Sequence, residues 1–175
     1  CGTNGELQVY NGTSWTNFTG GTRTSSVGAQ IGSDIDGEAA SDYSGYSVSL
    51  SSDGSIVAIG ATGNDGGGND AGHVRVYQNV SGTWTQVGSD IDGEAGGDQS
   101  GYSVSLSSDG TIVAIGAIKN DGNGTEAGHV RVYQNVSGTW TQVGSDIDGE
   151  AAGDRSGHSV SLSSDGSIVA IGARY

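Results

Sequence analysis

The sequence predicts an all-β fold, and three observations lead to this prediction. Apolar residues occur in short bursts of Val, Ile, Leu, Tyr and Trp, a pattern that suits half-buried strands. No window shows the apolar spacing of an amphipathic helix. A near-identical segment recurs every 56 residues and contains four strand-like stretches. Because four short strands in a unit of about 40–60 residues are typical of a propeller blade, we expect a β-propeller-like array of four-stranded antiparallel blades.

The repeat determines the domain organisation. The string GSDIDGE begins at Gly32, Gly88 and Gly144, and residues 32–87 and 88–143 are identical at 47 of 56 positions. The predicted repeat domain, residues 30–175, consists of units 32–87, 88–143 and the incomplete 144–175. Residues 1–29 are expected to contain strands that complete a blade, followed by an irregular insertion. A β-solenoid is the alternative architecture, although its coils are usually shorter than these units.

The four strands predicted within the first full unit span residues 46–50, 56–61, 74–77 and 83–87. The first alternates strictly and places Tyr46, Val48 and Leu50 on one face. Ser51-Ser52-Asp53-Gly54 then predicts a tight turn, because Asp-Gly readily adopts positive φ. The second strand is apolar on both faces, which is expected of a central strand covered on both sides.

Composition excludes several classes of function. The 175 residues include 34 Gly and no Pro or Met, and 6 basic against 20 acidic residues give a formal net charge of −14. Such a surface repels phosphate backbones, so nucleic-acid binding is disfavoured. No apolar run approaches the roughly 18–20 residues of a membrane helix, so the chain is not expected to span a membrane. Since the sequence starts at Cys1 without any Met, we expect a processed product or an excised fragment.

Three motifs of the second unit carry a family resemblance. The stretches DQSGYSVSL (98–106), IVAIGA (112–117) and GHVRVY (128–133) together resemble an FG-GAP repeat, the blade of integrin-α-type β-propellers and of many bacterial surface proteins. The resemblance extends over residues 30–175. In this chain the "GAP" element is reduced to Gly-Ala without the Pro, and the "FG" element is replaced by Ser-Gly. Residues 7–15 are similar to a segment of Bacteroidetes surface proteins. The resemblance implies a secreted or cell-surface protein of bacterial, Bacteroidetes-type origin.

The resemblance also implies a calcium site, but the corresponding turn of this chain has too few carboxylates to form it. Members of the family often bind Ca²⁺ in an Asp-rich hairpin between blade strands. The corresponding turn here carries one carboxylate per repeat, at Asp53, Asp109 and Asp165. One carboxylate is too few for a cation that takes 6–8 oxygen ligands. We therefore do not place the family's calcium site at this turn.

A second acidic loop is a better calcium candidate. It offers four carboxylates within nine residues in each repeat, and hard oxygen ligands suit Ca²⁺ over transition metals. The candidate ligands are Asp34, Asp36, Glu38 and Asp42, then Asp90, Asp92, Glu94 and Asp98, then Asp146, Asp148, Glu150 and Asp154. The alternative is a solvated acidic loop without metal. Another loop, residues 64–70 with its equivalent 120–126, is rich in Asn, Asp and Gly. It is either a cation site or a flexible turn.

Histidine and tryptophan positions follow the repeat. His73 and His129 occupy the same position, and His158 replaces a Tyr of the other units. A catalytic residue is seldom repeated in every blade, so we interpret these histidines as structural and expect no enzyme. Trp15, Trp84 and Trp140 are either packing aromatics, the favoured interpretation, or exposed platforms for sugar stacking.

The resulting functional prediction is a non-enzymatic protein, extracellular or at the cell surface, that acts in adhesion or in recognition of a protein or glycan ligand. Calcium is its predicted cofactor. The alternative is a subunit of an extracellular fibre, because unpaired strands at the ends of the array allow self-association.

Overall fold

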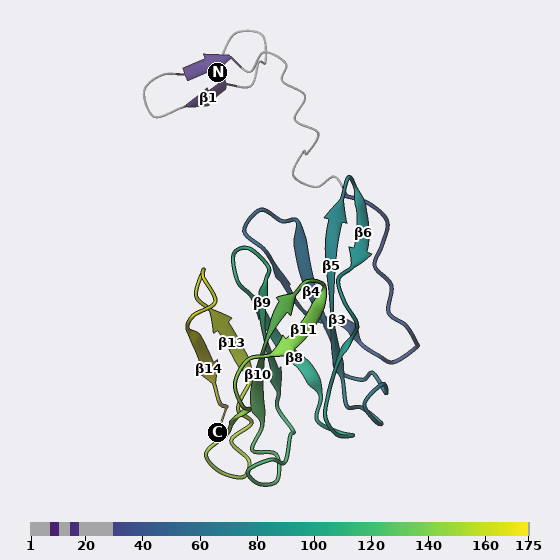
Figure 1. Ribbon diagram of the computed structural model, residues 1–175, viewed down its shortest axis with the longest axis vertical. Helices are drawn as coiled ribbons and strands as arrows, with labels where there is room; N and C mark the ends of the chain where they lie inside the picture. The colour runs from purple at the N-terminus through teal and green to yellow at the C-terminus, as the bar shows by residue number, and fades with distance from the viewer. Residues whose placement is uncertain (1–7, 11–14, 18–29, 175) are drawn as a thin grey trace. The chain divides into compact units, whose positions relative to one another are not determined.

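The fold is described from a computed structural model, which describes residues 8–10, 15–17 and 30–174. The chain divides into two units, residues 1–31 and 32–175. In the first unit β1 (Gln8–Tyr10) pairs antiparallel with β2 (Trp15–Asn17) (Figure 1). Most of the predicted insertion lies outside the described residues.

The second unit consists of antiparallel sheets, and its described residues contain no helix (Figure 1). The first blade comprises β3 (Ser44–Leu50), β4 (Ile56–Ala61), β5 (His73–Val80), β6 (Thr83–Gln86) and β7 (Ile91–Asp92). The second comprises β8 (Ser100–Leu106), β9 (Ile112–Ala117), β10 (His129–Val136), β11 (Thr139–Gln142) and β12 (Ile147–Asp148). The third repeat contributes β13 (Ser159–Leu162) and β14 (Val169–Gly172). The predicted all-β class and blade-like antiparallel sheets are confirmed, and the sheets are open rather than closed into a ring.

Each blade has one short strand that the sequence pattern did not predict. β5 is long enough to pair with two partners: Tyr77–Val80 pair with β6, while His73 and Val74 pair with β7. The β5–β6 hairpin turns at Ser81 and Gly82, both with positive φ, as a two-residue primed turn requires. The chain then returns along β5, so that the acidic loop of the next repeat lies against the beginning of this strand.

The tight turn predicted between the first two strands of each blade is confirmed. Oδ1 of Asp53 accepts hydrogen bonds from Oγ of Ser51 at 2.7 Å and from the backbone N–H of Ser55 at 2.9 Å, and Gly54 has φ 72°. These hydrogen bonds, led by the one from the Ser55 backbone, lower the pKa of Asp53 to about 2. The carboxylate therefore closes the turn.

The hydrophobic core lies between the two complete blades. Its buried residues are Ala58, Val74, Val76, Ile91, Val104, Leu106, Val113, Ile115 and Tyr133. The central strands β4 and β9 are buried along most of their length, as predicted. Trp140 is half-buried and packs against this core, so it is a packing aromatic whose remaining surface is accessible.

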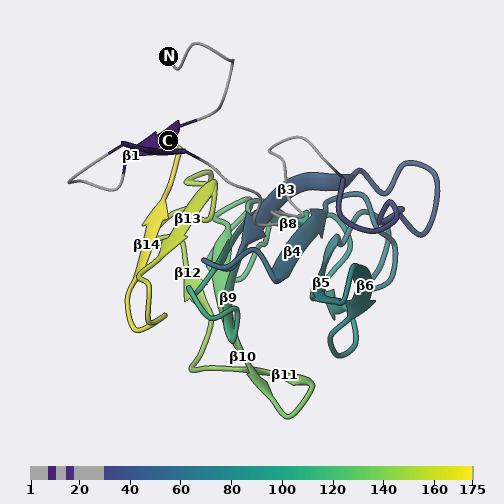
Figure 2. The same ribbon diagram turned by 90° about the horizontal axis from the view of Figure 1, so that it is seen from above.

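Successive repeats contact each other through the same hydrogen bonds, which recur one period apart. Figure 2 shows the sheets of the repeats from above. Oγ of Ser47 donates to the Gly101 carbonyl at 2.7 Å, and Oγ of Ser49 accepts from the Leu106 amide at 3.0 Å. Two equivalent hydrogen bonds join the second repeat to the third. The rings of Tyr46, Tyr102 and His158 follow one another with centroids 5.0 and 5.1 Å apart.

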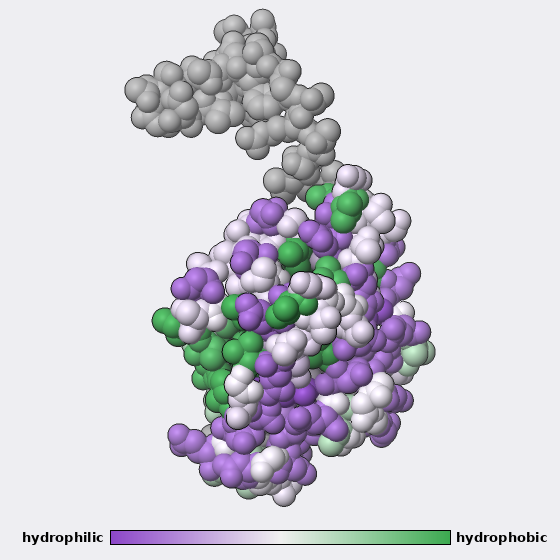
Figure 3. Space-filling view, in the orientation of Figure 1, coloured by the Kyte–Doolittle hydropathy of each residue, from purple (hydrophilic) through white to green (hydrophobic). Residues whose placement is uncertain are grey.

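Both ends of this stack leave apolar side chains accessible. On β3, Val48 and Leu50 are 63% and 59% exposed. In the third repeat Ile168 is exposed, and Val160 and Leu162 are half-buried. Hydrophobic residues accordingly gather on the surface over β13 and β14 (Figure 3).

Candidate functional site

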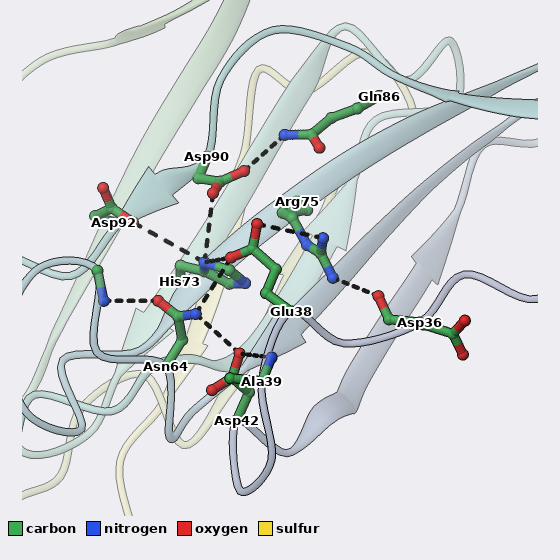
Figure 4. Close-up of polar contacts among 11 residues, drawn as sticks. Asp36, Glu38, Ala39, Asp42, Asn64, His73, Arg75, Gln86, Asp90 and Asp92 are labelled. Carbon is green, nitrogen blue, oxygen red and sulfur yellow. Dashed lines mark hydrogen bonds and ion pairs between the residues drawn. The ribbon is translucent and has the colours of Figure 1, made fainter.

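The candidate site arises where two acidic loops approach β5. Because β7 pairs with the start of that strand, His73 stands opposite Asp92. The loop that enters the first blade brings Glu38 to the same place (Figure 4). One histidine and carboxylates from two successive repeats therefore meet.

The side chain of His73 is 1% exposed, and three carboxylates lie around its ring (Figure 4). Its Nδ1 atom lies 3.8 Å from Oε2 of Glu38, 3.8 Å from Oδ2 of Asp90 and 4.0 Å from Oδ1 of Asp92. These separations are too long for hydrogen bonds. Within the described part of the chain, this buried nitrogen has no hydrogen-bond partner.

The other oxygen of each main carboxylate is held by a neighbouring side chain (Figure 4). Oε1 of Glu38 lies 3.7 Å from a guanidinium nitrogen of Arg75, and Oδ1 of Asp90 accepts a hydrogen bond from Nε2 of Gln86 at 2.6 Å. Nδ2 of Asn64 lies 3.4 Å from Oε2 of Glu38. These contacts fix the orientation in which one oxygen of each carboxylate faces His73.

Arg75 is itself fixed in place. It donates to the Asp36 carbonyl at 2.8 Å, and its guanidinium lies 5.6 Å from the centre of the Tyr77 ring. The positive charge of Arg75 is therefore held beside Glu38.

The same arrangement recurs in the second blade. Nδ1 of His129 lies 3.9 Å from Oε2 of Glu94 and 3.9 Å from Oδ2 of Asp146. Arg131 lies 3.6 Å from the other oxygen of Glu94, and Gln142 donates to the other oxygen of Asp146 at 2.6 Å. His129 is 1% exposed, and among the described residues neither of its ring nitrogens has a hydrogen-bond partner.

Burial is the main influence on the titration of both rings. It lowers the pKa of His73 below its ordinary value, with Asp90 opposing the effect and Arg75 adding to it. It also lowers the pKa of His129, where Arg131 acts in the same direction. Both imidazoles are therefore neutral near pH 7, which is the form that can bind a metal ion.

The carboxylates predicted as calcium ligands lie in different places and make different contacts. Within one loop Asp90 and Asp92 face His73, whereas Glu94 faces His129 of the following blade. The last carboxylate of each loop, Asp42, Asp98 or Asp154, accepts the backbone N–H three residues before it. Asp34 and Asp36 line a pocket described below, and Asp148 and Glu150 line an open pocket beside the third repeat.

The Asx-rich loop predicted as a second cation candidate is ordered by its own hydrogen bonds. Oδ1 of Asn64 accepts the Gly66 amide at 2.8 Å, and Oδ1 of Asp65 accepts the Asp70 amide at 2.9 Å. Nδ2 of Asn64 donates to Asp42 at 3.0 Å, which ties this loop to the acidic loop.

A half-open pocket occurs once in each complete blade, beside these clusters. The first has a volume of about 330 Å³ and lies between loop 32–36, Tyr77 and the β5–β6 turn with Trp84. Its equivalent, about 300 Å³, lies between loop 88–92, Tyr133 and Trp140. Carboxylate, hydroxyl and aromatic groups thus line both pockets.

Comparison with known proteins identifies the repeat. Residues 84–133 match the family model described as FG-GAP repeat. This segment is an FG-GAP repeat. No curated protein matches the chain. FG-GAP repeats are typically extracellular and non-enzymatic. No described helix is long and apolar enough to cross a membrane.

Packing explains the two glycine motifs of the FG-GAP repeat. A Cβ atom at Gly60, of the "GAP" element, would lie 2.1 Å from the carbonyl oxygen of Gly101, of the "FG" element in the next repeat. Gly116 and Gly157 show the same approach. The two motifs are therefore the two sides of one contact between blades.

Sequence reasoning missed His73 and His129 as site residues. Their repetition argued against catalysis, but a repeated fold places the same cluster of side chains in both complete blades. The available signal was that His, Arg and the acidic loop all recur with one period.

Proposed function

We propose that these FG-GAP repeats form a non-enzymatic recognition module of an extracellular protein, which serves adhesion by binding a glycan or protein ligand. One observation carries the proposal: the same aromatic and acidic pocket of about 300 Å³ occurs at the equivalent place of both complete blades. A pocket that recurs in each unit favours repeated binding over a single catalytic centre.

The pocket lining favours a glycan. Trp84 and Tyr77 supply apolar ring surface, while Asp34 and Thr83 supply polar groups for hydroxyls. The chain presents two such pockets on one framework, so a ligand with repeating sugar units can engage both and gain avidity. Loops carried by a rigid scaffold are the usual place for such recognition.

Binding of the whole chain to a printed array of neutral and acidic oligosaccharides tests this proposal. Exposed Thr83 and Thr139 line the pockets, so T83R/T139R fills both with a long side chain. The control T85R/T141R places the same charge on exposed residues of the same strands outside the pockets. We expect T83R/T139R alone to abolish binding. Failure of the unmodified chain to bind any glycan, or equal binding by both variants, would refute the pockets as glycan sites.

Calcium stabilisation of the acidic loops stays a prediction. Thermal unfolding in Ca²⁺ and in chelator tests it, with a higher Tm in Ca²⁺ as the expected result. Substitution of Asp34 and Asp36, or of the equivalent Asp90 and Asp92, should reduce this increase in Tm, because both pairs line equivalent pockets.

A second candidate function, the subunit of an extracellular fibre, is supported by the exposed face of β3. The corresponding face of β8 is covered by the preceding repeat, and its Val104 and Leu106 are only 9% and 7% exposed. In another copy, β13 and β14 of the third repeat are the equivalents of β3 and β4, two of the strands that cover β8 here. A head-to-tail contact of this type generates closed rings or open filaments.

Light scattering at increasing concentration tests the fibre. V48E introduces a charge on the exposed β3 face, and V80E does so at a similarly exposed residue outside it. We expect mass to grow with concentration for the unmodified chain and V80E but not for V48E. A chain that stays monomeric throughout would rule out this candidate.

A further inference from the structure

We propose that the clusters Glu38–His73–Asp90 and Glu94–His129–Asp146 each bind one divalent transition-metal ion of the Zn²⁺ type. The binding atoms are Nδ1 of the histidine and one oxygen of each carboxylate. In both clusters the possible ligand atoms lie within 4.8 Å of one another. Asp90 also lines one of the pockets, but the inference rests on the histidine and carboxylate geometry and not on glycan binding.

The separations within each cluster fit ligands of a shared ion. Hydrogen bonds between nitrogen and oxygen measure about 2.7–3.2 Å, whereas Nδ1 of His73 stays 3.8 Å from both main carboxylates. Zinc bonds to nitrogen and oxygen are each about 2.1 Å long, so two ligands at a tetrahedral angle are about 3.4 Å apart. Because the carboxylates are partly exposed, a small rotation brings their oxygens to that spacing.

The buried nitrogen supplies a second, independent indication. A buried polar atom normally has a hydrogen-bond partner, and one without a partner destabilises the fold. Nδ1 of His73 and Nδ1 of His129 have no partner among the described residues, yet each is directed at carboxylate oxygens. Binding of a cation at this position would satisfy both the nitrogen and the oxygens.

The residues around each cluster hold its carboxylates in the way that outer groups usually hold metal ligands. Gln86 and Arg75 each hold the outer oxygen of one carboxylate, and Gln142 and Arg131 do so in the second cluster. Outer groups of this kind orient metal ligands and tune their affinity. The two carboxylates leave an excess of negative charge over the single Arg beside a neutral imidazole, which a divalent ion compensates.

The ligand chemistry selects the class of metal. Imidazole with carboxylate suits zinc and its neighbours, whereas Ca²⁺ prefers oxygen ligands alone. The middle acidic loop shares its carboxylates between the two clusters: Asp90 faces His73 and Glu94 faces His129. Bound ions would therefore link consecutive repeats through this loop.

Isothermal titration of the metal-free 175-residue chain with Zn²⁺ and, separately, with Ca²⁺ tests the inference. We expect two Zn²⁺ ions per chain, at micromolar concentration or below, and a higher Tm when they are bound. H73Q/H129Q removes the nitrogen ligands, while E38Q/E94Q alters half-exposed residues and should leave the fold intact. Each double variant should weaken binding by at least about 10-fold.

H158Y is the matched control, because it replaces the third histidine by the Tyr found at the equivalent position of the other repeats. It should bind two ions as the unmodified chain does. Absence of Zn²⁺ binding, or binding that E38Q/E94Q leaves unchanged, would overturn the inference. Tighter binding of Ca²⁺ than of Zn²⁺ at the same residues would overturn the assigned metal class.

Discussion

β3 and β8 share the sequence SGYSVSL, but they differ in burial. Val104 and Leu106 of β8 are 9% and 7% exposed, whereas Val48 and Leu50 of β3 are 63% and 59% exposed. Both segments form strands of the same length with the same bulge after their first residue. Local sequence therefore specifies the strand, and the preceding repeat determines whether its apolar face is buried.

This difference shows how stability is distributed in the array. A repeat cannot bury its apolar face alone, so a large part of its stabilisation comes from the neighbouring unit. Substitutions at equivalent positions should thus have unequal effects wherever the contact crosses a repeat boundary. They should have equal effects wherever the contact is internal to one repeat.

The largest difference in the free energy of unfolding is expected between alanine substitutions at Leu106 and Leu50. L106A creates a cavity in the core between the blades and should lower the free energy of unfolding by about 2–5 kcal/mol. L50A removes an exposed side chain and should cost about 0.5 kcal/mol or less. Urea denaturation of both variants measures the difference. Equal losses would mean that β3 is covered in solution, by another copy for example.

The second largest difference in the free energy of unfolding is expected between alanine substitutions at Gly116 and Gly172. At Gly116 a Cβ would meet the Gly157 carbonyl at 2.1 Å, so G116A must separate two blades and should cost about 1–3 kcal/mol. At Gly172 the close atom is Oγ of Ser159, a side chain that can rotate away. G172A should therefore be nearly neutral in the same denaturation experiment. A neutral G116A would show that the blades slide apart at little cost.

A smaller effect is expected for the serine bonds between repeats. Oγ of Ser105 accepts the Leu162 amide at 2.9 Å, so S105A leaves this amide unpaired and should cost about 0.5–1.5 kcal/mol. Ser161 is the equivalent residue of the last repeat, and S161A serves as the control. Hydrogen exchange of the Leu162 amide should accelerate in S105A alone. Unchanged exchange would argue against this bond in solution.

The elements of each blade could be predicted because their signals are local. Alternation over Tyr46–Leu50 and the Asp-Gly turn depend only on neighbouring residues, and both are observed. β7 has only two residues, too few for any periodicity. It forms because β5 extends beyond β6 and offers free backbone groups to the returning chain.

The site was predicted only in part because its residues come from three segments. Glu38 and Asp90, which the sequence offered as calcium ligands of separate loops, lie together in one cluster with His73. Sequence alone suggested that one loop supplies a complete ligand set. The pairing of β7 with β5 instead places one loop between two histidines, and no spacing along the chain reports that arrangement.

The turn aspartates give the smallest effect and complete the comparison, because their contacts stay within one repeat. Asp53, Asp109 and Asp165 each accept the same local hydrogen bonds, whether or not a neighbouring repeat covers the blade. D53N, D109N and D165N should therefore lower the urea midpoint to a similar, small extent.

The same turns predict how stability depends on acid. Hydrogen bonds lower the pKa of Asp53 and of Asp165 from the ordinary 3.8 to about 2, and they also lower that of Asp109. A carboxyl with a lowered pKa stabilises the fold above pH 3.8, and this contribution is lost as the pH falls through about 2. Urea midpoints of the triple Asn variant should accordingly fall less steeply between pH 4 and pH 2 than those of the unmodified chain. Identical slopes would mean that the pKa of these carboxyl groups is the same in the folded and the unfolded chain, against the lowered values expected here. Unequal effects of the three single variants would show that even this turn depends on the neighbouring repeat.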